Sequence, residues 1–213
     1  MSDHVVLMAD IIDSRKFNSK ELISDFKRLA NFINKKWKKV IVSPITITLG
    51  DEFQSVIDTE MNAVRIIFEI EEFIIKSKFQ FKLRYVMNYG RIETSVNSSI
   101  AYEMLGEGLS KTREKLNKLK TSKKRFSFLS LQNQKNQVNM NKLFVIYQNF
   151  VDQWRQNEFE FVHLFLEGKS YQSIAAELNI NTASAWKRQK SLHIEEYFIC
   201  KDLIFSLFLM NDD

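Results

Sequence analysis

Asp10 and Asp51 are the residues of this chain whose types and surroundings best suit chemistry. Asp10 directly follows the apolar segment Val5–Ala9, which is typical of a buried strand. Asp51 lies in the run Leu49-Gly50-Asp51-Glu52-Phe53-Gln54, where glycine followed by aspartate favours a tight hairpin turn. If the two strands are neighbours, both carboxylates converge at one sheet end and suit Mg²⁺ carrying a nucleotide phosphate.

A purely structural interpretation of these acids stays open beside the chemical one. Gly-Asp turns are common, and an acid at the end of a strand often only caps a helix or a turn. The flanking segments 45–49 and 53–57 alternate apolar and polar side chains, so a hairpin is expected under either interpretation.

Two motifs resemble a known family. The motifs are Met8-Ala9-Asp10-Ile11-Ile12-Asp13-Ser14 and Thr48-Leu49-Gly50-Asp51-Glu52-Phe53-Gln54, and both are similar to segments of the bacterial SatD family. The resemblance to this family covers most of the chain. Those proteins in turn resemble class III nucleotidyl cyclases and diguanylate cyclases over roughly residues 1–130. The resemblance implies metal binding by the side chains of Asp10 and Asp51 and by the carbonyl of Ile11.

The same resemblance implies a nucleotide site around these acids. Backbone N–H groups at the mouth of the following helix would face the phosphates, and Glu52 takes the place of a second, catalytic acid. The implied nucleotide-binding residues are Ile12, Asp13, Ser14, Gly50 and Ser110.

The chain also departs from the cyclase pattern. Cyclases carry an Asn and an Arg on a late helix, and the corresponding stretch here is Gly106-Glu107-Gly108-Leu109-Ser110-Lys111-Thr112-Arg113. Ser110 replaces the Asn, and Arg113, the implied catalytic arginine, comes one position early, which turns it by about 100° around a helix. Ile47 stands where adenylyl cyclases carry a purine-reading lysine. These changes predict nucleotide binding with slow or no turnover, because such reactions need preorganised cations.

Hydrophobic periodicity predicts an α+β fold with a ferredoxin-like βαββαβ domain followed by an all-α domain. The resemblance implies that the first domain is nucleotidyl-cyclase-like. We expect helices on one face of the sheet. The expected strands are 4–9, a 45–57 hairpin, 79–89 with 91–96 as its candidate partner, and 125–131. The expected helices are 19–40, 60–77 and 105–120. The polar segment 132–139 lacks periodicity, so the predicted domains are 1–131 and 140–213.

The second domain contains a predicted helix-turn-helix at about 158–192. Gly168 is suited to ending one helix, Ser170 to capping the next, and Thr182 to capping the third. The run from Glu167 to Arg188 resembles the DNA-binding motif of LuxR-type regulators and sigma-factor region four. The candidate DNA contacts are Thr182, Ser184, Lys187, Arg188 and Lys190, with a packing module that does not bind DNA as the alternative.

Composition indicates the compartment and the oligomeric state to expect. The 213 residues carry a net charge of +5, 45% hydrophobic residues and a single cysteine, Cys200, which excludes an internal disulfide and fits a reducing compartment. No signal sequence or membrane span is expected, so the predicted location is the cytoplasm. The apolar helix 194–209 predicts packing on the first domain or on a second copy, which makes a homodimer the expected state.

Three functions follow. The first is a DNA-binding regulator whose N-terminal domain senses a nucleotide with Mg²⁺. The second is a metal-dependent nucleotidyl cyclase or related nucleotidyltransferase acting on a nucleoside triphosphate. The third is an adaptor in which neither motif is active. The intact third helix and the altered Ser110 and Arg113 favour the first.

Overall fold

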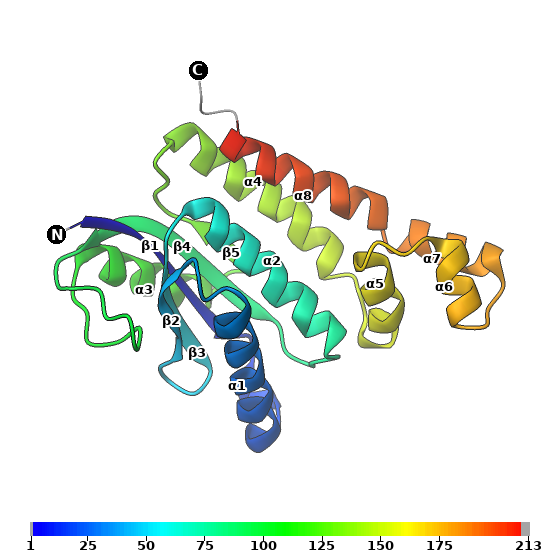
Figure 1. Cartoon of the computed structure of the whole chain (residues 1–213), viewed down its shortest axis with the longest axis horizontal. Helices are drawn as coiled ribbons and strands as arrows, with labels where there is room; N and C mark the ends of the chain where they lie inside the picture. Colours follow the sequence, from blue (N-terminus) through cyan, green and yellow to red (C-terminus); the bar gives the residue numbers. More distant parts are fainter. Residues whose placement is uncertain (1, 210–213) are drawn as a thin grey trace.

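The computed structural model describes residues 2–209, and its centre is a five-stranded sheet in the order β2-β3-β1-β4-β5 (Figure 1). The strands are β1 (Ser2–Ile11), β2 (Ile41–Ile47), β3 (Glu52–Ile57), β4 (Leu83–Ile92) and β5 (Phe126–Phe128). β1 runs antiparallel to both β3 and β4, whereas β5 is parallel to β4. The first four strands therefore have the predicted ferredoxin-like order, and β5 extends the sheet beside β4.

Helices cover both faces of this sheet, which corrects the expectation of a one-sided packing. Helices α1 (Ser19–Lys36) and α2 (Glu60–Lys76) lie on one face, where alternate β1 residues such as Leu7 and Ala9 enter their core. Helix α3 (Glu107–Leu119) lies on the other face and packs its Leu116 against Val6 and Met8. Because successive side chains of β1 point to opposite faces of the sheet, this strand contributes residues to both cores.

The predicted strand 91–96 is wrong. β4 continues to Ile92, and residues 93–106 form an irregular connection to α3. Ala101 in this connection is fixed to the hairpin, because its amide donates to Thr46 Oγ1 and its carbonyl accepts from the Gln54 amide.

The C-terminal part is helical. It consists of α4 (Gln134–Val151), α5 (Phe159–Leu166), α6 (Tyr171–Glu177), α7 (Thr182–Ser191) and α8 (Ile194–Leu209), with short 3₁₀ turns at Ser14–Lys16 (η1) and Gln156–Glu158 (η2). Residues 134–139, expected to lack structure, begin α4, whose first N–H groups are capped by Asn133. The predicted irregular boundary is therefore largely helix.

One aromatic core joins the sheet to these helices. Phe68 of α2 stacks on Phe144 of α4 at 5.7 Å and meets Phe205 of α8 at 5.4 Å between ring centroids. Phe126 of β5 lies 4.9 Å from Phe144. Figure 1 shows α4 and α8 side by side above α2, with α5, α6 and α7 at one end of the molecule.

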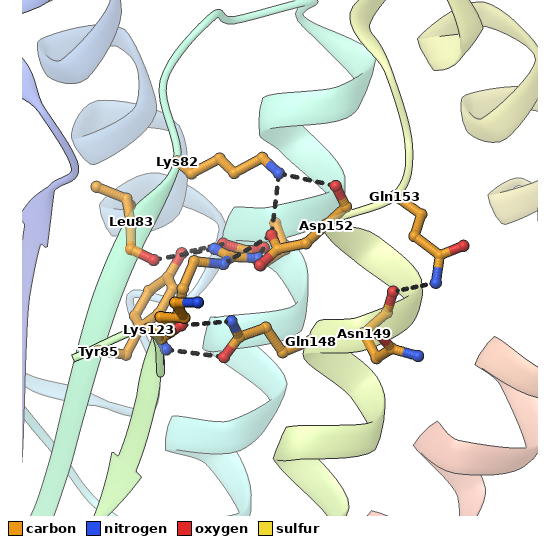
Figure 2. A network of polar contacts seen from close by, with 10 residues as sticks. Lys82, Leu83, Tyr85, Lys123, Gln148, Asn149, Asp152 and Gln153 are labelled. Atoms are coloured by element: carbon orange, nitrogen blue, oxygen red, sulfur yellow. Dashed lines mark hydrogen bonds and ion pairs between the residues drawn. The ribbon is translucent and has the colours of Figure 1, made fainter.

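A buried polar network fastens α4 to the sheet (Figure 2). Arg125, 3% exposed, forms a two-pronged ion pair with Glu71 at 2.7 and 3.1 Å and reaches Asp152 at 3.0 Å. The Tyr85 hydroxyl donates to Glu71 at 2.8 Å, and the Lys82 ammonium donates to Asp152 at 3.0 Å. Burial, and after it the Glu71 carboxylate, raises the pKa of Tyr85 well above its usual value.

No helix within residues 2–209 is both long and apolar enough to cross a bilayer.

Burial raises the pKa of the Cys200 thiol to about 11, so this cysteine is an unreactive part of the core.

Candidate functional site at the sheet end and the α7 surface

Strand register brings Asp10 and Glu52 together on the face covered by α3. The two residues are cross-strand partners in the antiparallel β1–β3 pair, so their side chains project from the same face. Both are 3% exposed. Asp10 lies within β1 and not after it, because the strand continues through Ile11.

Three cationic side chains surround this pair of acids. Arg84, the cross-strand partner of Asp10 on β4, places its Nη1 3.1 Å from Asp10 Oδ2. Lys120, at the end of α3, lies 2.7 Å from Glu52 Oε1 and 3.7 Å from Asp10 Oδ2. Arg113 of α3 forms an ion pair with Glu52 Oε2. Such compensation is what allows two carboxylates to stay buried side by side.

One oxygen of the cluster has no partner. Asp10 Oδ1 is buried and accepts no hydrogen bond from any described residue. Burial is the main cause that raises the Asp10 pKa; Arg84 and Lys120 oppose the rise, and Glu52 adds to it. For Lys120, burial lowers the pKa, but Glu52, Asp10 and Asp51 outweigh it and raise the value.

The hairpin between β2 and β3 presents Asp51 beside this cluster. Gly50 adopts φ +84°, a left-handed conformation that favours glycine, as the Gly-Asp pair predicted. The Asp51 carbonyl accepts the Ile11 amide at 2.8 Å, and its carboxylate accepts the Ser14 hydroxyl at 2.6 Å. The hairpin is thereby tied to the loop that follows β1.

The amides expected to face phosphate are only partly available. The Ile12 amide already donates to the Lys82 carbonyl at 2.9 Å. Asp13 is left-handed (φ 55°) and pairs with Lys16 at 2.7 Å, which lowers the pKa of Asp13 through that hydrogen bond. The loop enters the short η1 turn, and α1 begins only at Ser19, capped by Asn18.

A glycine contact seats α3 against the sheet. A Cβ on Gly108 would lie 2.7 Å from the carbonyl carbon of Gly90, so this close approach of two backbones excludes a side chain. With α3 in this position, Arg113 reaches Glu52, although it lies one position earlier in the sequence than the arginine of the cyclase pattern. Ser110 instead lies on the exposed side and donates to the Gly106 carbonyl at 3.3 Å.

The donor set fits a hard divalent cation only in part. Asp10 Oδ1 and Asp51 offer carboxylate oxygens of the type that Mg²⁺ prefers. Within the described residues, however, no group of three or more His, Cys, Asp or Glu side chains is arranged to hold a metal ion. Lys120 also lies against both buried acids, so a cation shared by Asp10 and Glu52 would compete with its ammonium group.

The second candidate site is the α6–α7 pair. Gly168 (φ +81°) follows α5 and Ser170 caps α6, both as predicted. Asn181, not Thr182, caps α7: its side chain accepts from the Ala183 amide at 2.8 Å. Thr182 is instead the first residue of α7, and Asn competes well for the cap position.

The outer side of α7 is open to solvent, while its inner side packs on its neighbours. Ile174 of α6 and Ala185 of α7 are completely buried. Among the predicted DNA contacts, Thr182, Ser184 and Lys187 are exposed, and Lys187 makes no ion pair within the described residues. Trp186, 46% exposed, joins them on this side.

Two of the predicted contacts have partners inside the molecule. The Arg188 guanidinium lies 4.8 Å from the Phe161 ring centroid and 4.0 Å from Glu158, so it packs on α5. Lys190 pairs with Glu195 at 2.6 Å. Lys187 is therefore the most accessible of the three basic side chains.

Comparison with known proteins agrees with the motifs. The profile of the SatD family matches residues 4–208. This chain belongs to the SatD family. No curated protein matches the sequence closely enough to count as a relative.

Solved structures with some similarity to this chain include cyclase domains. One similar structure is a bacterial light-regulated adenylyl cyclase, with 12% identity and TM-score 0.46 over 60% of this chain and 75% of the other. Another is the guanylate cyclase domain of RhGC from Catenaria anguillulae in complex with GTP, with 16% identity and TM-score 0.38 over 53% and 70%.

Sequence reasoning missed two cations of the SatD site. Arg84 could have been found from the alternation along β4, which places it on the same face as Val86 and Asn88. Lys120 belongs to a basic stretch whose sequence fits either a solvated edge or a contact to a triphosphate, and its position becomes informative only when α3 is seated on the sheet.

Proposed function

We propose that this SatD protein is a DNA-binding regulator whose sheet-end site senses a nucleotide. The observation that carries the proposal is the buried oxygen Asp10 Oδ1, which has no partner although three cations lie around its carboxylate and that of Glu52. A buried acceptor without a partner is costly, and an incoming ligand that satisfies it lowers that cost.

The charges of the site suit a phosphorylated ligand with a divalent cation. Asp10 and Asp51 would hold Mg²⁺, which when bound neutralises phosphate oxygens and orients them. The Lys120 side chain, 40% exposed, is the cation of the cluster best placed to leave Glu52 and meet a phosphate. Arg84, 12% exposed and fixed to Asp10, would keep that carboxylate oriented.

The α7 surface supports the DNA-binding half of the proposal. A short helix with a buried inner side and an exposed outer side follows a tight turn at the end of the molecule (Figure 1). The helix N-terminus with Thr182 and Ser184 would meet the base edges of the major groove, and Lys187 a phosphate.

Catalysis by the same site is the second candidate. Arg113 does reach the acid cluster, which favours an enzyme more than the sequence alone did. Its guanidinium is engaged by Glu52, however, and Ser110 lies on the exposed side of α3. We therefore rank slow or absent turnover ahead of cyclase or nucleotidyltransferase activity.

Thermal unfolding with each nucleoside triphosphate, with and without Mg²⁺, tests the sensing half. We expect a Mg²⁺-dependent rise in melting temperature, because a ligand that binds only the folded state stabilises it. The rise should vanish in Asp10→Asn and Asp51→Asn and persist in the surface control Asp3→Asn. No rise with any nucleotide would reject the sensor, and abundant product that is lost in Asp51→Asn would make the protein an enzyme.

Mobility shifts on duplex DNA over a series of salt concentrations test the other half. Lys187→Ala should weaken binding to all sequences and reduce the salt slope by about one phosphate contact. Lys169→Ala, outside α7, is the matched control. Failure of the wild-type protein to bind any duplex at low salt would reject DNA binding.

A further inference from the structure

The outer side of α4 and α8 is an apolar surface without an intramolecular partner. Ile146 of α4 is 48% exposed, and Ile199 and Leu203 of α8 are 59% and 50% exposed. The two helices lie against each other, and Leu203 follows Ile199 by one helical turn. Aliphatic side chains exposed together in this way mark an interaction surface more often than a free one.

The two helices run antiparallel. Near one end, the Asn136 amide donates to the Leu207 carbonyl at 2.6 Å, and at mid-length the Cys200 thiol meets the Leu143 carbonyl at 3.6 Å. Because these pairs join the start of α4 to the end of α8, the midpoints of both helices lie at the same level.

Opposite charges flank the apolar side chains on the two helices. At about 100° per residue, Lys135, Lys142 and Ile146 fall within about 40° on α4. Glu195, Ile199 and Asp202 fall within about 60° on α8 by the same rule. The α4 strip is thus basic and the α8 strip acidic.

Lys142 and Asp202 are both exposed, and neither makes an ion pair within residues 2–209. Glu195, in contrast, already pairs with Lys190. Lys142 and Asp202 each stand halfway along their helix.

We propose that this surface binds a second copy of the chain through a two-fold axis that lies in the interface, parallel to α4 and α8 and midway between them. The axis places α4 of one copy over α8 of the other and so brings Lys142 onto the partner's Asp202, twice per dimer. Ile146 of each copy then packs against Ile199 of the other, Leu203 lies in the same face, and the result is a four-helix arrangement.

The size of the surface sets the expected strength. Two helices about 25 Å long, with axes about 10 Å apart, offer a face of roughly 500 Å² per copy. The total of about 1,000 Å² lies at the lower limit for specific association, so we expect a micromolar dimer. The outer side of α7 stays free, because α7 lies beyond the end of the α4–α8 pair (Figure 1).

Sedimentation equilibrium of the full chain tests the proposal. We expect a monomer–dimer equilibrium for the wild type, and a dissociation constant raised roughly tenfold or more by Ile146→Glu or Leu203→Glu. Ile23→Glu, the same change at a similarly exposed position on α1, should leave the constant unchanged. Circular dichroism checks that each variant is folded.

A charge exchange separates this geometry from other dimers. Lys142→Glu and Asp202→Lys should each weaken the dimer, and the double variant should restore it, because the exchanged charges again face each other. A wild-type monomer at about 100 µM, a dimer insensitive to both glutamate substitutions, or a double variant weaker than either single one would overturn the proposal.

Discussion

At the scale of residues, the site is governed by how five charged groups share a small buried space. Arg84, Arg113 and Lys120 form ion pairs with the carboxyl groups of Asp10 and Glu52, and this arrangement leaves one Asp10 oxygen without a partner. Binding of a cation at that oxygen and release of Lys120 from the acids are expected to be coupled.

The raised pKa of Asp10 predicts how Mg²⁺ binding depends on pH. Only the ionised carboxylate binds a metal, so the Mg²⁺-dependent rise in melting temperature should disappear on acidification at a higher pH than for an ordinary aspartate. Thermal unfolding from neutral to acidic pH measures this, and Asp10→Asn should show no Mg²⁺ effect at any pH. A Mg²⁺ effect that persists below pH 3.8, the ordinary value, would contradict it.

In the protein without ligand, ionisation of Asp10 should instead reduce stability. Because the folded-state pKa of Asp10 is raised, its ionisation lowers the free energy of unfolding as pH rises from 3.8 through the raised value.

Replacement of Lys120 should separate metal from phosphate binding. Lys120→Ala removes the ammonium from between Asp10 and Glu52, so Mg²⁺ alone should bind more tightly. The nucleotide should bind roughly tenfold more weakly, through loss of one charged hydrogen bond. Isothermal titration calorimetry measures both, with Lys118→Ala, two residues away and paired with Glu114, as the control. Parallel changes in both affinities would show that Lys120 does not compete with the metal.

At the scale of elements, the hairpin and the helices that carry the site could be read from the sequence. The alternation on both sides of Gly50, and the apolar periodicity of 60–77 and 105–120, depend only on local chemistry. The face on which α3 packs could not be read, because it is set by the contact of Gly108 with Gly90, two residues far apart in the chain.

The Gly108–Gly90 contact predicts an asymmetric response to alanine. Gly108→Ala should lower the free energy of unfolding by about 1–3 kcal/mol, since a Cβ there meets backbone atoms that cannot move aside. Gly50→Ala, whose Cβ would meet nothing within 4 Å, should cost only about 1 kcal/mol for its positive φ. Urea unfolding compares them, and equal losses would contradict the contact.

At the scale of the whole molecule, a polar network that includes Lys82 and Asp152 joins the sheet to the helical part (Figure 2). Sequence analysis placed a boundary at 132–139 because that segment is polar, but α4 begins there and joins the aromatic core. Phe144 and Tyr147 pack on Phe68 of α2 and so hold α4 against the first part of the chain. Hydrophobic periodicity alone cannot show which element such side chains pack on.

The Arg125–Glu71 pair should respond as a unit. Arg125→Met leaves the buried Glu71 carboxylate with only the Tyr85 hydroxyl, which should cost about 3–5 kcal/mol of unfolding free energy. Adding Glu71→Gln should recover part of that loss, because the uncompensated charge is removed. Urea unfolding of both singles and the double variant gives the coupling energy, and additive losses would contradict it.

The most direct test of the whole account is the affinity for duplex DNA, measured by fluorescence anisotropy with and without Mg²⁺ and nucleoside triphosphate. The proposed regulator predicts that the wild type binds DNA with a salt-dependent affinity that the nucleotide changes, and that Asp10→Asn binds DNA but no longer responds. An affinity that the nucleotide leaves unchanged, or shifts equally in Asp10→Asn, would contradict the account.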